Sequence, residues 1–543
     1  MSAYPPPSSL AQFNPATQSP SVLEVNGTTT SNIQAINENG TTTAPIKIGS
    51  DGSLQATIRE PLSGFGELPV IIPQPRIQID AIYGILSTDI DTQSATGGTA
   101  DSINQMFRCQ SGVSVGGYSV IRSKNIISYR AGQSIRVRFT ASYTAGVALS
   151  LQGAGPFNAT NGFFVGYQGT QFGIWRRQPG TTAIYRLTFT VGTGGNETHS
   201  ITLNGVLTSY ATVGVLSTSA LAENIAENIT PTGWTSSVSP RSNGATITFI
   251  QGTPGTTPGT FTYSSTGTAT ATFSQLTAGT ANDDSTYFVP QTSWNIDKLD
   301  GSNSAMNPTG ELLDKTKLNI WQVVIPYLGA GSIKFYRGDS ESHMEAFHVI
   351  EYSNQFTTPS QSNPSYRIGW ISASLGSTTN LTVQGASGAG FIEGDLSILR
   401  SPFSFSGTIS AGTTEYVIFA IRGRGDFLNR NNQKQILLLN LSASLDTSNR
   451  IATINVYANP TLTAGTTNWQ YINQSLSCVE YCSPTTLTPS GGIIVQSFTT
   501  TNSTIIIDLQ RLNVRLTSFD TFAISCKTTS GSSTVLCSLN WAE

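Results

Sequence analysis

Few side chains in this sequence could act as acids, bases or metal ligands. Its 543 residues include three histidines, and two of them, His343 and His348, lie five residues apart with glutamates nearby. This spacing matches no usual zinc-binding pattern on a strand or a helix. We therefore interpret both histidines as polar residues of a loop beside a strand, and we predict no metal site and no cofactor.

Two carboxylates that face each other across a groove would support glycoside hydrolysis. The sequence offers candidates for such a pair, and nothing in it excludes that two of them share a groove: Asp283, Asp284, Asp297, Asp300 and Glu311. The neighbours Asp283 and Asp284 are explained more simply by a solvated turn. No phosphate-binding or nucleophile-elbow motif occurs in a credible context, and the run from Arg422 to Gly425 is typical of a loop. We predict no catalytic residue, with a glycan hydrolase as the alternative.

The five cysteines are too few for a disulfide framework in a chain of this length. Cys478 and Cys482 lie four residues apart, and Cys526 and Cys537 fall on segments that we expect to pair as strands. Either pair could bind a metal or form a disulfide in an oxidising environment. For Cys526 and Cys537 we favour the role of small buried side chains.

The composition indicates an all-β protein. Charged residues make up 11% of the chain, less than half of the roughly 25% found in ordinary globular proteins. Glutamate and lysine, which favour helices, are sparse, whereas glycine, serine, threonine and asparagine are abundant. Because hydrophobic residues reach 38% and the net charge is only −3, the chain is not of the disordered type. We predict tandem β-sandwich or jelly-roll-like domains.

Charge and hydropathy also exclude two kinds of partner. The sequence contains no basic stripe or cluster of lysine and arginine, so we expect no nucleic acid. No window approaches the roughly 18 consecutive apolar residues of a transmembrane helix, so we expect no membrane insertion. The first residues lack the basic and apolar regions of a signal peptide, which favours synthesis in a reducing compartment.

The densest aromatic stretch runs from Asn161 to Gln178. Two apolar runs flank the polar link Gln168-Gly169-Thr170-Gln171, which is typical of a β-hairpin with a short turn. Alternation places Phe164 on one face and Phe163 and Tyr167 on the other, so we expect the hairpin in the middle of a sandwich. Its aromatic residues are predicted contacts of the core or of an oligomer: Phe163, Phe164, Tyr167, Phe172 and Trp175.

Periodicity and composition divide the chain into four predicted parts. Residues 1–75 form an extended, proline-rich arm, whose composition alone favours a flexible leader over an anchor. Residues 76–185 and 291–395 form the main β-sandwich, and residues 186–290 form a small inserted α+β module. Residues 396–543 form a C-terminal, jelly-roll-like β-sandwich.

Two local predictions bear on this division. The segment from Thr218 to Ala226 is the one good helix candidate, with Ser217 or Thr218 as its N-cap. Leu221 and Ile225 give that helix one apolar face, because they lie four residues apart. After the insertion, the main sandwich is expected to resume with a strand from Trp294 to Asp300.

Short motifs are scattered over nearly the whole chain. Tyr4-Pro5-Pro6-Pro7 with Phe13-Asn14-Pro15 is similar to a "YPPP…FNP" N-terminal segment, and the stretch from Arg59 to Leu68 is similar to "TPLTAFGEL". The hairpin from Gly162 to Tyr167, the segment from Gly369 to Asn380 and the ending Ser538 to Trp541 add to this set. Together they resemble virion structural proteins of giant nucleocytoplasmic large DNA viruses and of large tailed phages.

The resemblance implies a structural virion protein without catalytic activity, made in the host cytoplasm. It would be a capsid-surface fibre or spike, or a capsid-associated protein, and a homo-oligomer such as a trimer that contacts other capsid or virion proteins. It could bind a host-surface glycan or receptor, and a tailspike-like glycan-binding or glycan-hydrolysing protein is the alternative. In this context the arm becomes an anchor, because a preformed polyproline segment loses little entropy on binding. The implied docking residues are Tyr4, Pro5, Pro6, Pro7, Phe13 and Pro15.

Overall fold

The computed structural model describes residues 73–543, which belong to one compact unit, Ile71–Glu543. In the separate unit Met1–Val70 it describes only the backbone of six short strands, from β1 (Ser9–Phe13) to β6 (Leu54–Gln55). Short gaps interrupt the range 73–543 at 230, 239–243, 285, 395–401, 429, 433, 447–449, 465–466, 484–485, 502–503, 510–514 and 517–519. Of the docking residues of the arm, the backbone of Phe13 ends β1, which pairs with β2 (Pro20–Glu24). The other docking residues and the motif from Arg59 to Leu68 lie outside the described residues.

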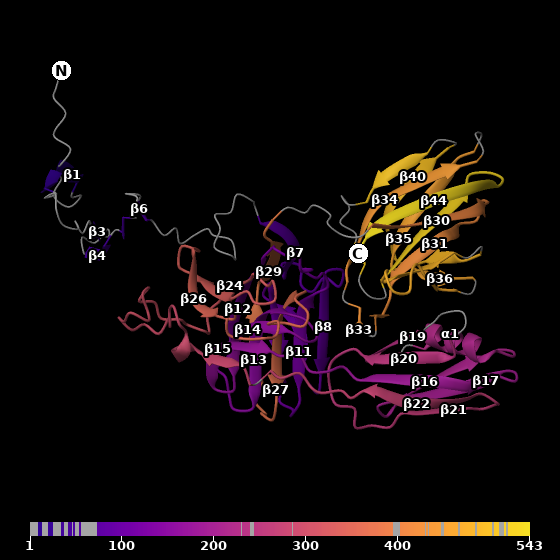
Figure 1. Cartoon of the computed structure of the whole chain (residues 1–543), viewed down its shortest axis with the longest axis horizontal. Helices are drawn as coiled ribbons and strands as arrows, with labels where there is room; N and C mark the ends of the chain where they lie inside the picture. The colour runs from indigo at the N-terminus through magenta and orange to yellow at the C-terminus, as the bar shows by residue number, and fades with distance from the viewer. Residues whose placement is uncertain are drawn as a thin grey trace, which may run out of the picture. The chain divides into compact units, whose positions relative to one another are not determined.

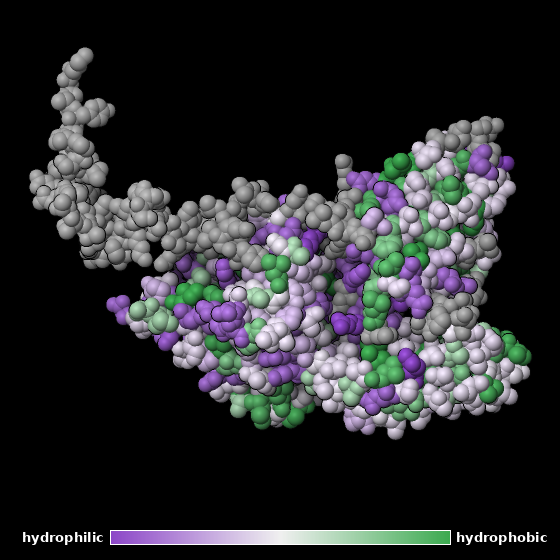
Figure 2. Space-filling view, viewed as in Figure 1, coloured by the Kyte–Doolittle hydropathy of each residue, from purple (hydrophilic) through white to green (hydrophobic). Residues whose placement is uncertain are grey.

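The protein is all-β and sandwich-like, as the composition predicts. Strands make up 54% of the chain and helix only 3% (Figure 1). Weakly hydrophilic residues cover much of the visible surface, and strongly hydrophilic ones form small scattered groups (Figure 2). No helix in the described part of the chain has the length and the apolar character needed to cross a membrane.

The main sandwich consists of two antiparallel sheets. One has nine strands: β26 (Met344–Ile350), β25 (Ile333–Gly338), β24 (Asn319–Ile325), β12 (Ile135–Tyr143), β28 (Thr382–Gly385), β10 (Met106–Gln110) and β9 (Thr99–Ile103), with β29 (Ser387–Ile392) between β12 and β7 (Gln74–Asp80). The other has seven strands, in the order β23 (Phe288–Pro290), β15 (Gln171–Arg177), β14 (Gly162–Gln168), β13 (Ser150–Phe157), β27 (Arg367–Ser374), β11 (Tyr118–Ser123) and β8 (Ile90–Ala95).

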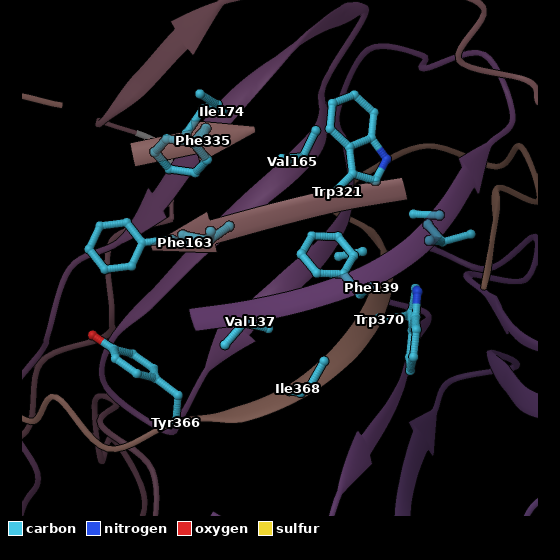
Figure 3. Close-up of a cluster of buried hydrophobic side chains, with 14 of the residues drawn as sticks. Val137, Phe139, Phe163, Val165, Ile174, Trp321, Phe335, Tyr366, Ile368 and Trp370 are labelled. Atoms are coloured by element: carbon cyan, nitrogen blue, oxygen red, sulfur yellow. The ribbon is translucent and has the colours of Figure 1, made fainter. Parts of the chain in front are cut away.

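The core of the main sandwich lies between these sheets and is rich in aromatic side chains. The seven-stranded sheet contributes Phe163, Val165 and Trp370, and the nine-stranded sheet contributes Trp321 and Phe335 (Figure 3). Each of these side chains is at most 1% exposed. Such burial of large apolar groups is the main favourable term in folding.

The predicted hairpin is confirmed as β14 and β15. Gln168 pairs with Gln171, so only Gly169 and Thr170 form the turn, and Gly169 takes a φ of +58° that glycine adopts without strain. The hairpin lies inside the seven-stranded sheet, because β23 and β13 flank it. Phe163 faces the inter-sheet core, whereas Phe164 faces the opposite side of the sheet.

The inserted module has two small sheets and the helix. The four-stranded sheet has the order β19 (Trp234–Val238), β20 (Thr246–Gln251), β16 (Ile184–Val191) and β22 (Thr270–Thr277). The three-stranded sheet has the order β18 (Val206–Thr212), β17 (Glu197–Leu203) and β21 (Thr262–Ser265). The predicted helix is confirmed as α1 (Thr218–Asn228), with Ser217 as its N-cap and with Leu221 and Ile225 buried.

The C-terminal sandwich also has two antiparallel sheets around one core. The five-stranded sheet has the order β30 (Pro402–Ala411), β44 (Ser533–Ala542), β34 (Ile436–Leu445) and β41 (Ile505–Asp508), and β42 (Arg515–Leu516) also pairs with β34. The six-stranded sheet has the order β37 (Gln470–Tyr471), β38 (Val479–Cys482), β31 (Tyr416–Gly423), β43 (Thr521–Thr528), β35 (Ala452–Ala458) and β40 (Ile493–Thr500). Small ribbons are formed by β32 (Asp426–Phe427) with β33 (Arg430–Asn431) and by β36 (Thr461–Thr463) with β39 (Thr488–Ser490).

Two strand predictions were wrong. The segment from Trp294 to Asp300 follows the short 3₁₀ helix η1 (Gln291–Ser293) and is irregular, because the Asp297 side chain accepts a bond from the backbone N–H of Leu299 at 2.9 Å. Such local bonds compete with a strand ladder. The strands that carry Cys526 and Cys537 do not pair, since β43 and β44 belong to different sheets of the C-terminal sandwich.

Candidate ligand-binding groove

Two of the three histidines lie far from any shared site. His199 is fully buried, with its Nδ1 2.8 Å from the Tyr263 hydroxyl and its Nε2 2.8 Å from the Thr212 hydroxyl. Burial lowers the pKa of His199, so it is held as a neutral hydrogen-bonded group. His343 is exposed, 3.5 Å from the carboxylate of Asp339. Within the described ranges, no three histidine, cysteine, aspartate or glutamate side chains are grouped to hold a metal ion.

His348 lies inside β26 rather than in a loop beside a strand, which corrects the sequence-based interpretation. Its side chain is 6% exposed, and its Nδ1 accepts a bond from the backbone N–H of Asn295 at 3.3 Å. Burial lowers the pKa of His348 to about 4. The imidazole is therefore neutral at physiological pH and joins β26 to the preceding irregular segment.

Two of the candidate carboxylates do meet, but in a cavity too small for a sugar. Asp297 and Glu311 line a cavity of about 10 Å³ together with Arg337, which forms an ion pair with Glu311. A cavity of this volume holds about one water molecule. The Asp297 carboxylate also accepts a bond from the Thr309 hydroxyl at 2.6 Å. These groups close a loop and leave no room for a glycosidic bond.

The other candidate carboxylates also stabilise the fold. Asp284 forms two bonds of 2.8 Å with the guanidinium of Arg177, so it is part of an ion pair and not merely of a solvated turn. The backbone of Asp283 pairs with that of Gln178. Asp300 accepts a bond from the backbone N–H of Ser302 at 2.9 Å, which is typical of a tight turn.

The most fully satisfied carboxylate is one that the sequence did not single out. Glu197 is 4% exposed and accepts bonds from the Ser265 hydroxyl at 2.6 Å and from the backbone N–H groups of Ala269, Gly194 and Thr268 at 3.0, 2.8 and 2.9 Å. These donors, the Ser265 hydroxyl foremost, hold the pKa of Glu197 well below its usual range. Glu197 thus ties two loops of the inserted module together.

All five cysteines are buried free thiols. Burial raises the pKa of Cys109 and of Cys526 to about 12, and it also raises the pKa of Cys478, Cys482 and Cys537. Because the thiolate is the nucleophile and the metal ligand, none of these groups is reactive near neutral pH. Cys526 and Cys537 lie in the core of the C-terminal sandwich, in the role of small buried side chains.

The segment from Arg422 to Gly425 is only partly a loop, because β31 includes Arg422 and Gly423. Arg422 forms an ion pair with Glu480 at 3.1 Å and lies 4.2 Å above the centre of the Trp469 ring. Arg424 lies 4.0 Å above the centre of the Tyr471 ring. These cation–π contacts are packing interactions of the six-stranded sheet.

The main sandwich carries a groove on the outer face of its seven-stranded sheet, the face opposite the core. Alternate residues of three neighbouring strands form an apolar floor there: Val120 from β11, Leu151 and Phe157 from β13, and Ile371 from β27. Tyr118 adds a half-buried aromatic ring. Gly252 and Thr253 of the inserted module and Asn432 and Lys434 of the C-terminal sandwich complete the lining. The groove has a volume of about 650 Å³, within the range of pockets that hold small organic ligands.

Stacked aromatic rings support this floor. Phe164 and Trp175 are stacked with their centres 3.7 Å apart and their planes within 10°. The Trp175 indole N–H donates to the carbonyl of Gln152 at 3.1 Å. Gly153 permits this arrangement, since a Cβ there would lie 2.6 Å from the indole ring. These contacts fix the two rings against the strand beneath the floor.

One end of the groove is cationic. Arg122 pairs with Asp91 at 2.7 Å, and Arg367 lies 3.6 Å from the same carboxylate oxygen. Arg367 pairs in register with Phe157 of β13. Arg177 lies above the Phe157 ring at 5.9 Å. The three arginines therefore form a row across the end of the sheet, next to the apolar floor.

The predicted site residues fall into two sets. The structure places Phe163, Phe164, Phe172 and Trp175 inside the folded chain, each at most 6% exposed, and leaves only Tyr167 half-buried. These buried residues pack in the two hydrophobic clusters on either face of the seven-stranded sheet. Of the docking residues of the arm, only the backbone of Phe13 is described, at the end of β1.

The groove was not predicted from the sequence. A local signal exists, since Tyr118, Val120 and Arg122 alternate along one strand and Arg367 and Ile371 share a face of another. This alternation does not indicate which distant strands become neighbours, so it cannot show that the arginines meet.

No protein-family model and no curated protein matches this sequence. Among solved structures, a lectin from Bauhinia forficata in complex with GalNAc aligns with 60% of this chain and 98% of its own, at 11% identity and a TM-score of 0.19. The Faustovirus major capsid protein aligns with 83% of this chain and 89% of its own, at 9% identity and a TM-score of 0.08. TM-scores this low do not establish a shared fold, so neither structure supports a function for this chain.

Proposed function

We propose that this chain is a structural protein of a virion surface that binds a host-surface glycan in the groove of its main sandwich and does not cleave it. The single observation that carries the binding role is the groove itself: an apolar floor beside a row of arginines on the outer face of the seven-stranded sheet. The virion location rests on the resemblance of the short motifs to giant-virus and phage proteins.

The chemistry of the groove suits a saccharide. Sugar rings have one apolar face of C–H groups and a rim of hydroxyls. The half-buried Tyr118 and Ala373, beside the floor of Val120, Leu151 and Ile371 (4–7% exposed), complement the apolar face. The arginine side chains donate hydrogen bonds to the rim. The half-buried Tyr118 offers both an apolar ring and a hydroxyl.

The roles of the potentially reactive groups support binding without catalysis. His199 and His348 are held neutral in hydrogen bonds, and the cysteines are buried thiols. The carboxylate closest to the groove, Asp284, is neutralised by Arg177. A retaining or inverting glycosidase needs two carboxylates on either side of the scissile bond, and the residues that line the groove include only Asp284.

We further propose that the chain is a homo-oligomer, such as a trimer, that contacts other virion proteins through residues 1–60. Two edge strands of the C-terminal sandwich support self-association, because β40 and β41 carry exposed apolar residues. Ile493, Ile494 and Ile506 are each more than half exposed. Exposed apolar edges of this kind favour pairing with another chain.

Deleting residues 1–60 tests the anchor. The shortened chain is expected to stay folded and to keep its oligomeric mass, about three times that of one chain if the protein is a trimer, where the full chain has 57.6 kDa. It is also expected to be absent from particles assembled in infected cells. Light scattering and immunoblots of purified particles measure the two outcomes. Normal incorporation of the shortened chain would contradict the anchor, and the mass of a single chain would contradict the oligomer.

A further inference from the structure

We propose that the groove selects a saccharide that carries a carboxylate, and that Arg367 is the residue that recognises this carboxylate. The inference rests on the proposed function of the groove as a glycan site, and it adds the chemical class of the ligand and the residue that determines specificity.

The three arginines at the end of the groove are not equally well paired with carboxylates. Arg177 is neutralised by Asp284 through two bonds of 2.8 Å. Arg122 engages Asp91 through its Nε at 2.8 Å and through a terminal nitrogen at 2.7 Å. Arg367 lies 3.6 Å from the Asp91 oxygen that Arg122 already holds. Arg367 therefore shares Asp91 with Arg122, and Asp520 is the other carboxylate that acts on it.

Arg367 is also partly withdrawn from water. Its side chain is 24% exposed. Burial, with repulsion from Arg122, lowers the pKa of Arg367 to about 10, although Asp91 and Asp520 favour its charged form. A guanidinium that is partly desolvated and shares its counter-charge is stabilised when a further anion binds. The Lys434 side chain lines the same groove and adds positive charge.

The position of Arg367 explains why the anion should belong to a sugar acid and not to a free ion. Arg367 and Phe157 are paired in register on adjacent strands, and Ile371 lies further along the same strand as Arg367. A ring that lies on the apolar floor would thus bring a carboxylate substituent within reach of the guanidinium. A planar guanidinium binds a carboxylate through two parallel hydrogen bonds, a geometry that a hydroxyl group cannot reproduce.

The test compares probes that differ only in the carboxylate. Methyl glycosides of glucuronic and galacturonic acid are titrated into the full chain beside the neutral methyl glucoside and galactoside, with the methyl glycoside of N-acetylneuraminic acid as a further acid. Calorimetry or ligand-observed NMR reports the affinity. At least one acidic probe is expected to bind about tenfold or more tightly than the neutral probes, since a charge-assisted bidentate pair has that strength. Added salt is expected to reduce the difference.

Variants of Arg367 test whether this residue causes the preference for acidic probes. Arg367→Gln is expected to abolish the preference, so that the acidic probe binds no more tightly than the neutral probes. Arg367→Lys is expected to restore part of it, because the charge remains without the planar fork. Arg186→Gln is the matched control, since Arg186 is an exposed strand arginine of the inserted module and lies outside the groove. Circular dichroism verifies that each variant is folded.

The possible outcomes are distinct. Equal affinity of the native chain for acidic and neutral probes would overturn the inference and leave the proposed glycan site standing. An acidic preference that persists in Arg367→Gln would overturn the assignment of Arg367. Absence of binding for every probe would overturn the glycan site and, with it, the inference. The native-chain comparison decides the question even if a variant fails to fold.

Discussion

Replacing Trp175 by alanine is expected to lower the free energy of unfolding of the main sandwich by about 3–5 kcal/mol. Trp175 is fully buried, stacked on Phe164, and donates its indole N–H to the carbonyl of Gln152. The substitution opens a large cavity beneath the groove and leaves a buried carbonyl without this donor. Chemical denaturation followed by circular dichroism measures the loss.

Two further variants make this result specific. Phe163→Ala, on the opposite face of the same hairpin, is expected to cost a similar amount, about 3–5 kcal/mol, because Phe163 is also fully buried. Tyr83→Ala is the control and is expected to change stability by about 0.5 kcal/mol or less, since Tyr83 is 83% exposed. A loss below about 1 kcal/mol for Trp175→Ala would contradict a hairpin buried on both faces.

The second large effect is a dependence of stability on pH through His348. Burial lowers the pKa of folded His348 from 6.5 to about 4. The unfolded chain therefore takes up a proton at this residue below about pH 6.5, whereas the folded chain does not. The contribution of His348 is fully present above pH 6.5 and is lost as the pH falls to about 4. The loss is on the order of 3 kcal/mol.

Carboxylates and His199 also titrate, so the stability of the native chain alone does not report on His348. The contribution of His348 is isolated by comparing the native chain with a variant that lacks this residue. The difference in unfolding free energy between the native chain and His348→Gln is expected to shrink between pH 6.5 and 4. Leu207→Ala is the control and is expected to show no such change, because it removes an exposed side chain that carries no titratable group. Urea denaturation at a series of pH values gives these differences. A constant difference between the native chain and His348→Gln would show that His348 is not held neutral by burial.

Local patterns in the sequence predicted the elements that depend on local chemistry. The turn at Gly169 and the alternation of Phe163 and Phe164 define the hairpin, and Ser217 with Leu221 defines the start and the apolar face of α1. Glycine in a turn, a serine cap and apolar periodicity act over a few residues. They therefore appear in the sequence without knowledge of the rest of the fold.

The predictions that were wrong depended on tertiary contacts. The residues from Trp294 to Asp300 are apolar enough for a strand, yet Asp297 bonds to its own backbone neighbours and Trp294 fills the core from an irregular segment. Cys526 and Cys537 lie on consecutive strands that cross between two sheets instead of forming a hairpin. Sequence spacing does not reveal which sheet a strand joins.

One part of the groove could be predicted from local sequence patterns, and the other part depends on tertiary contacts. Its apolar floor follows from alternation within β11, β13 and β27, which a sequence pattern can predict. Its cationic end requires the pairing of β11 with β8 and β27, which brings Arg122, Asp91 and Arg367 together from distant parts of the chain. For the same reason, the partner of Arg177 could not be predicted, since Asp284 lies 107 residues further along the chain.

The most direct test of the central claim measures retention and cleavage of a polysaccharide in one experiment. The purified chain is incubated with immobilised acidic polysaccharide from host-cell surfaces, and both bound protein and newly formed reducing ends are quantified. We expect the immobilised polysaccharide to retain the native chain saturably and Arg367→Gln more weakly, and we expect no new reducing ends. The release of reducing ends by the native chain would contradict a non-catalytic binding protein and would favour a glycan hydrolase.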